Sequence, residues 1–171
     1  MKTLDLFESS SHLVEDWALI GKLALAAQVE ILPTIDLDFL VSFKDFEGLR
    51  RLLASLNFEI AVVELPEGKK LLRFWEKKDL VPVDLVEAKY PWEKDILQEA
   101  LVLEVFGQKV KVARKEDILV LKLAHYRSFK DQTDLEILLR DPSLDHERVE
   151  HLARKAGVEE KWKRLKMQGS L

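Results

Sequence analysis

The sequence predicts an α+β fold that ends in a helical lobe. Over residues 1–113, short apolar runs of strand type alternate with helical segments and turn residues, which is typical of a mixed α/β core. From residue 114 onward the apolar residues recur only at helical spacing. The length of 171 residues fits one domain with at most a small appended lobe. We therefore expect an α/β core at 1–113 and a helical lobe at 114–171 that packs on it.

The composition is that of a soluble globular protein, with 47% hydrophobic and 34% charged residues. Because the chain has no cysteine, it forms no disulfide-linked partner and no thiolate zinc site. The net charge of −4 argues against nonspecific nucleic-acid binding through a broad basic face. No apolar run approaches the roughly 20 residues that span a bilayer, and the first residues lack the basic and apolar regions of a secretory signal. We expect a cytoplasmic protein without a membrane partner.

The N-terminal part of the chain predicts three helices and two strands. Residues 11–17 start with a serine that can cap a short helix, and the apolar run 17–21 is typical of a buried strand. The strong helix formers of 22–29 predict a second helix. Apolar, β-prone residues predict a strand at 34–43, and leucines at helical spacing predict a helix at 46–58.

The middle of the chain predicts three consecutive strands, at 59–65, 70–77 and 81–88. Turn residues separate them, and Pro66 and Gly68 join the first pair.

A short helix and a hairpin complete the predicted core. The helix covers 92–100, and the hairpin covers 101–113 with its turn at Gly107. Helical periodicity then continues through the rest of the chain, in the segments 115–129, 131–141 and 145–167.

Two aspartates stand in the apolar strand "TIDLDFLV". Side chains at positions i and i+2 of a strand share a face, so Asp36 and Asp38 project together with Thr34 beside them. Two such carboxylates repel each other unless a cation lies between them, and oxygen ligands favour Mg²⁺ or Mn²⁺. The alternative is a strand with one solvated face, although aspartate has a poor strand propensity.

Gly21 stands where a predicted strand runs directly into a predicted helix. The backbone N–H groups at the start of a helix can bind phosphate oxygens. A metal site and a phosphate site together are what phosphoryl or nucleotidyl transfer requires.

The run "IGKLALAAQVEILPTIDLDFLV" resembles the first motif of nucleotidyltransferases of the DNA polymerase β superfamily. That motif is a strand, a glycine followed by glycine or serine, a helix, and Asp-x-Asp on a second strand. Within the superfamily the chain is similar to small bacterial enzymes related to abortive-infection nucleotidyltransferase toxins and to minimal nucleotidyltransferases. The resemblance covers about 17–139 and implies a nucleotidyltransferase-type mixed β-sheet flanked by helices.

The resemblance also implies roles for residues further along the chain. Asp84, in the strand "VPVDLVEA", matches the third carboxylate of the family, which ligates metal and helps to deprotonate the acceptor hydroxyl. Alternatively, Asp84 pairs with a nearby lysine or caps a turn. Lys122 matches a helical lysine that binds a phosphate, and its alternative is a lysine whose stem covers the core.

The helical motif of the family continues with three supporting residues, Lys130, Asp131 and Asp134. Asp131 and Asp134 lie three positions apart and are therefore neighbours on a helix. They either take part in the site or stabilise the start of the helix. Lys130 can hold this segment to the core through an ion pair.

Lys22 is where the sequence departs from the family pattern, because the family has glycine or serine directly after Gly21. A lysine can reach the triphosphate as a point charge. It can also block the close approach of phosphate to the backbone.

The sequence thus favours a metal-dependent nucleotidyltransferase that uses an NTP and Mg²⁺ or Mn²⁺ to modify a hydroxyl of a protein, an RNA or a small molecule. Asp36, Asp38 and Asp84 are the expected catalytic and metal-binding residues, while Gly21, Lys22, Thr34 and Lys122 are the expected nucleotide-binding residues. The alternative function is a non-catalytic module of the same fold that acts as a regulatory or antitoxin-type partner of another protein.

Overall fold

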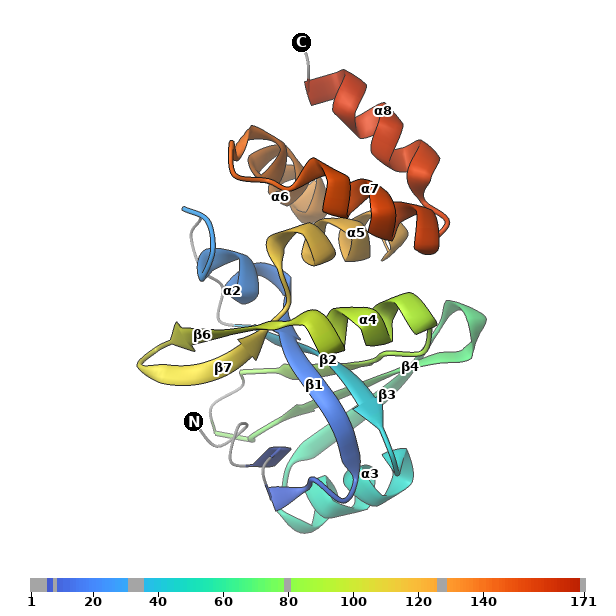
Figure 1. The fold of residues 1–171 in the computed structure, drawn as a ribbon. Coiled ribbons are helices and arrows are strands. Elements are labelled where there is room, and N and C mark those ends of the chain that lie inside the picture. The colour runs from blue at the N-terminus through green and yellow to red at the C-terminus, as the bar shows by residue number, and fades with distance from the viewer. Residues whose placement is uncertain (1–5, 8, 31–35, 79–80, 126–128, 170–171) are drawn as a thin grey trace.

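A computed structural model describes residues 6–7, 9–30, 36–78, 81–125 and 129–169. Its centre is a mixed sheet of seven strands in the order β3-β4-β5-β2-β1-β7-β6 (Figure 1). The strands are β1 (Val14–Ile20), β2 (Leu37–Phe43), β3 (Glu59–Leu65), β4 (Lys69–Trp75), β5 (Val83–Glu87), β6 (Leu101–Val105) and β7 (Gln108–Val112). The helices are α2 (Gly21–Ala26), α3 (Phe46–Ser55), α4 (Pro91–Glu99), α5 (Lys115–His125), α6 (Phe129–Arg140), α7 (His146–Lys155) and α8 (Glu159–Gly169), and a 3-10 turn (Pro66–Gly68) joins β3 to β4.

The centre of the sheet combines antiparallel and parallel pairing. Strand β2 lies between β1, which is antiparallel to it, and β5, which is parallel to it. Strand β4 pairs antiparallel with β5, and β7 pairs parallel with β1. Strands β2, β5 and β4 are therefore neighbours, and their alternate side chains form one continuous face.

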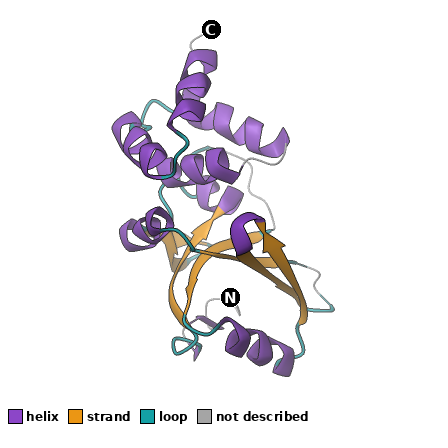
Figure 2. Cartoon of the chain, turned by 90° about the vertical axis from the view of Figure 1, so that its right-hand side faces the viewer, coloured by secondary structure: helices purple, strands orange, loops and turns teal. Residues whose placement is uncertain are grey.

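Helices cover the sheet unequally. Helices α5, α6, α7 and α8 gather on one side of the molecule, beyond α4, whereas α3 lies at the opposite side of the sheet (Figures 1 and 2). This arrangement confirms the predicted α+β fold, with a mixed sheet flanked by helices and a helical C-terminal part. No helix in the described part of the chain is both long enough and apolar enough to cross a membrane.

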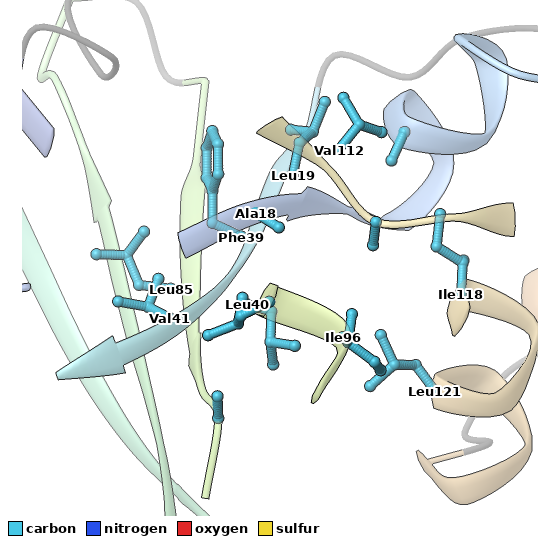
Figure 3. Close-up of a cluster of buried hydrophobic side chains, with 14 of the residues drawn as sticks. Ala18, Leu19, Phe39, Leu40, Val41, Leu85, Ile96, Val112, Ile118 and Leu121 are labelled. Carbon is cyan, nitrogen blue, oxygen red and sulfur yellow. The ribbon is translucent and has the colours of Figure 1, made fainter. Parts of the chain in front are cut away.

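Strand β2 is packed on both of its faces by the buried core. On one face of the sheet, Leu40 packs toward α4 and α5, where Ile96 and Leu121 are buried with it (Figure 3). On the other face, the ring of Phe39 lies 5.7 Å from that of Trp17 and 5.0 Å from that of Phe7, edge to face in both cases. Burying such side chains contributes roughly 25 cal/mol for each Å² of apolar surface removed from water.

The structure corrects the sequence prediction at two places. The helix predicted at 11–17 is wrong, because β1 begins at Val14 and pairs with β2. A serine cap is a local signal of about 1 kcal/mol, and the sheet pairing of a largely apolar segment outweighs it. The helical segment predicted at 145–167 is divided into α7 and α8, because Gly157 has a φ of 70° and ends α7 in the left-handed conformation.

Candidate functional site

A cavity of about 480 Å³ lies between the sheet and helix α5. Its floor is made of alternate residues of three neighbouring strands, namely Asp38 and Leu40 of β2, Asp84 and Val86 of β5, and Lys69, Leu71 and Arg73 of β4. Its roof comes from one face of α5, through Ile118, Leu121, Lys122 and His125, which have the i, i+3, i+4, i+7 spacing of one helical stripe. Gly21 and Asp131 also line the cavity, at the end that contains Asp38, Asp84 and Lys122.

Asp38 and Asp84 lie side by side at one end of the floor, because they are direct partners in the parallel pairing of β2 with β5. Burial, and then the negative charges of Asp84 and Asp36, raise the pKa of Asp38 from 3.8 to about 6. A carboxylate in this position is costly to ionise, and a neighbouring cation would lower that cost.

Asp36 is placed differently from Asp38. It is exposed and lies just before β2, and it does not line the cavity, although its charge acts on Asp38. Thr34 lies outside the described residues. The described ranges contain no group of three or more His, Asp or Glu side chains arranged to hold a metal ion. The structure thus brings two of the three predicted carboxylates together in the cavity.

Arg73 is the partner of Asp84. Its guanidinium group donates two hydrogen bonds of 2.6 Å to the two carboxylate oxygens. The two residues face each other across the antiparallel pair β4–β5. The partner of Asp84 is thus an arginine and not the nearby lysine that the sequence suggested as the alternative. The available signal was an arginine in an apolar strand, separated from Asp84 by a single turn.

Gly21 lies directly against Asp38. Its φ is 70°, and a Cβ atom at this position would lie 2.3 Å from the Asp38 Oδ2 atom. Strand β1 ends at Ile20, the partner of Asp38 in the sheet, and α2 begins at Gly21. Glycine is therefore required here both by the backbone conformation and by the space that the carboxylate occupies.

Lys122 joins helix α5 to two carboxylates of α6. Its Nζ atom lies 2.8 Å from Asp131 Oδ1 and 2.8 Å from Asp134 Oδ2. Burial alone would lower the pKa of Lys122, but the hydrogen bonds to Asp131 and Asp134 outweigh burial and raise it. The Nζ atom of Lys22 lies 3.7 Å from Asp134 Oδ1. Lys22, Lys122, Asp131 and Asp134 thus form one charged network beside the cavity, while the side chain of Lys130 lies outside the described part.

A second charged cluster, which the sequence analysis missed, stands at the other end of the cavity. Lys69 and Glu93 form an ion pair in which both side chains are almost completely buried. The His125 Nε2 atom lies 3.2 Å from Glu93 Oε1 and 3.4 Å from Lys69 Nζ. Nothing in the local sequence relates His125 to positions 32 and 56 residues away, and only the fold brings the three side chains together.

Comparisons with known proteins give a fold and no sequence family. No family model matches the chain, and no curated protein matches it. Among solved structures, the chain is similar to the complex of ANT(2'')-Ia with adenylyl-2''-tobramycin, with a TM-score of 0.61 and 17% identity over 93% of this chain and 94% of that one. The solution structure of the antibiotic-resistance factor ANT(2'')-Ia gives a TM-score of 0.59 and 18% identity over 96% of this chain and 91% of that one.

A third similar structure is the lincosamide antibiotic adenylyltransferase LnuA in its lincomycin-bound form, with a TM-score of 0.56 and 16% identity over 79% of this chain and 90% of that one. The chain has the nucleotidyltransferase fold. At these identities the likeness establishes the fold alone, and the closer relation to abortive-infection enzymes stays a prediction.

Proposed function

We propose that this protein is a nucleotidyltransferase that transfers a nucleoside monophosphate from an NTP to a hydroxyl group. The observation that carries the proposal is the pairing of Asp38 with Asp84 at the end of a cavity, opposite the cationic side chain of Lys122. The fold of known adenylyltransferases supports the same reading. The structural neighbours act on antibiotics, and a hydroxyl-bearing small molecule, a protein and an RNA are the acceptor classes that we consider.

The carboxylates of Asp38 and Asp84 fit a hard divalent cation such as Mg²⁺ or Mn²⁺. They offer only oxygen atoms, which these ions prefer, and Mg²⁺ is commonly bound by one or two carboxylates together with waters and substrate phosphates. Asp36 would add negative charge from just outside the cavity. A bound Mg²⁺ ion supplies positive charge that neutralises the phosphate oxygens of the substrate.

Each residue of the site then has a definite task. Asp84 accepts the proton of the acceptor hydroxyl once Arg73 has moved to another anion, such as a phosphate of the substrate. The acceptor oxygen forms a bond to the α-phosphorus, while the bond from the α-phosphorus to the pyrophosphate oxygen breaks. Lys122 offsets the charge of the leaving pyrophosphate, and the backbone at Gly21 lies beside the phosphates.

Lys22 either binds the triphosphate or obstructs it, and one substitution distinguishes the two roles. If Lys22 binds the triphosphate, its ammonium group exchanges Asp134 for a phosphate oxygen, and Lys22→Ser should weaken MgATP binding about tenfold or more. If Lys22 obstructs the site, the same substitution should tighten binding. We favour the first outcome, because the contact of 3.7 Å with Asp134 already holds the Lys22 ammonium group beside Lys122.

The non-catalytic alternative also has support. Arg73 occupies both oxygens of Asp84, and Lys22 replaces the small residue of the family motif. A module that binds a partner protein and no nucleotide would keep this closed arrangement, and its melting temperature would not respond to an NTP.

The deciding experiment measures the melting temperature with MgATP and with MgGTP, because a ligand that binds only the native state must stabilise it. We expect a rise for the wild-type protein, and no rise for Asp38→Asn or Asp84→Asn. Glu104→Gln, an exposed change on β6, is the control that should keep the rise. Release of pyrophosphate in the presence of tobramycin, lincomycin or other hydroxyl acceptors then tests transfer. A wild-type protein that neither NTP stabilises would overturn the proposal.

A further inference from the structure

The second charged cluster, Lys69, Glu93 and His125, stands at the end of the cavity farthest from Asp84. Residues 69, 71 and 73 share one face of β4, and Arg73 pairs with Asp84. Four residues of a strand span about 13 Å, so Lys69 lies about that far along β4 from the Arg73–Asp84 pair. On the roof, His125 lies one helical turn beyond Lys122.

Lys69 lines the cavity and forms a buried ion pair with Glu93, which is unusual for a residue of a cavity wall. The two side chains are 2% and 0% exposed. Removing two charges from water costs several kcal/mol, and a well-packed apolar pair is often as stable or more stable. A fully buried ion pair whose lysine lines a cavity is therefore more readily explained by what enters the cavity than by stability.

The hydrogen bonds of Glu93 determine which ligands this end can accept. Its Oε1 atom contacts Lys69 and His125, and its Oε2 atom accepts hydrogen bonds from the backbone N–H groups of Lys89 (2.9 Å) and Tyr90 (3.1 Å). A carboxylate has about four lone-pair sites, so Glu93 has none left for a ligand. A cation that entered this end would meet the ammonium group of Lys69 and no available carboxylate.

His125 is the member of the cluster that a ligand can touch, since its side chain is 35% exposed whereas those of Lys69 and Glu93 are buried. Its ring stacks on that of Trp92, with centroids 6.2 Å apart and planes at 23°. Its Nε2 atom faces Glu93 and Lys69. When Nε2–H donates to Glu93 Oε1, Nδ1 becomes a donor to a ligand in the doubly protonated imidazole.

The floor between the two charged ends is apolar. Leu71 and Val86 are direct partners across β4 and β5, and Leu40 and Leu121 close the same stretch. A molecule that lies along this floor meets a proton acceptor at Asp84, then apolar side chains, then the cluster of Lys69, Glu93 and His125, whose net charge is positive when the imidazole is protonated.

We propose that the cavity binds an acceptor alcohol whose far end is an anion, a carboxylate or a phosphate, and that His125, oriented by Glu93 and Lys69, determines this specificity. The proposal rests on the proposed function only in naming the bound molecule as the acceptor. An anionic acceptor would distinguish this chain from enzymes whose acceptors are rich in amines, such as tobramycin.

The test uses four probes that share an eight-carbon chain and a terminal hydroxyl: 8-hydroxyoctanoate, 8-hydroxyoctyl phosphate, 8-amino-1-octanol and 1,8-octanediol. Binding is followed without nucleotide, through the ¹H–¹⁵N signals of the His125 imidazole. We expect at least one anionic probe to shift these signals saturably and to bind at least tenfold more tightly than the amine and the diol. The two anionic probes distinguish a carboxylate from a phosphate.

Two variants locate the effect. His125→Phe should weaken binding of the anionic probe about tenfold, as followed by calorimetry, whereas His151→Phe, an exposed change on α7, should leave it unchanged. Binding of the amine as tightly as the anions, binding of no probe, or no effect of His125→Phe would each overturn the inference. If anionic probes bind while no NTP raises the melting temperature, the anion site stands and the proposed function fails.

Discussion

The ionised Asp38 side chain destabilises the folded protein at neutral pH, because its pKa is higher in the native state than in the unfolded chain. The pKa rises from 3.8 to about 6 on folding, because of burial and the charges of Asp84 and Asp36. The native state therefore binds the proton more tightly than the unfolded chain does. The contribution of Asp38 to the free energy of unfolding is most favourable below about pH 4. It falls as the pH rises through the two pKa values and is constant above about pH 6 to 7.

We accordingly expect Asp38→Asn to stabilise the protein in metal-free buffer at pH 7.5, by at most about 3 kcal/mol. The gain should shrink as the pH is lowered toward 4.5, where the native carboxyl group is already protonated. Urea unfolding of both proteins across this range measures the effect, with Glu104→Gln as the control for an exposed charge. A destabilised Asp38→Asn protein at pH 7.5 would show that the carboxylate is satisfied in the absence of metal.

At the scale of single elements, the junction between β1 and α2 fixes how closely the backbone approaches Asp38. Gly21→Ala introduces a Cβ 2.3 Å from Asp38 Oδ2 at a φ of 70°. Gly157, between α7 and α8, has the same φ of 70° and nothing within 4 Å of an added Cβ. The two substitutions therefore share the backbone strain, roughly 1 kcal/mol, and differ only in the contact.

We expect Gly157→Ala to lower the free energy of unfolding by about 1 kcal/mol, and Gly21→Ala to lower it by about 2 kcal/mol or more. Only Gly21→Ala should also weaken MgATP binding, because it displaces a carboxylate of the site. Equal losses of stability in denaturant unfolding would mean that Asp38 can turn away at no cost.

Elements were predictable from the sequence where their signals are local. Aspartates in apolar runs point to Asp38 and Asp84 without any tertiary information, but the same signal also selects Asp36, which the structure leaves outside the cavity. The strand conformation of 14–16 depends on pairing with β2, more than twenty residues away, whereas a local serine cap predicted a helix there. Arg73, Glu93 and His125 were missed because their roles arise from partners that only the folded sheet brings together.

At the scale of the whole molecule, Arg148 of α7 connects three helices. It donates hydrogen bonds of 3.0 and 2.8 Å to Asp117 of α5, and its Nη1 atom lies 2.5 Å from Glu99 at the end of α4. Asp117 is fully buried. Burial raises the pKa of Asp117 to about 6, although Arg148 acts to lower it.

Arg148→Met leaves the Asp117 carboxylate buried without its partner, and we expect a loss of about 3 kcal/mol in the free energy of unfolding at pH 7.5. The loss should be smaller at pH 5, because a protonated Asp117 needs no cation. Arg154→Met, an exposed change on the same helix, serves as the control and should cost little. Thermal or urea unfolding at both pH values decides this, and an equal loss at the two values would assign the role of Arg148 to packing.

The alternation of β2 has a consequence for how such a protein can evolve or be engineered. Asp38 and Leu40 face the cavity, while Phe39 packs with Phe7 and Trp17 on the reverse side. An insertion or deletion of one residue in β2 would exchange the two faces and drive the carboxylate into the aromatic cluster. Mutational libraries of this strand should therefore tolerate many replacements of residue type but no change of length, and natural variation in length should be confined to the loops.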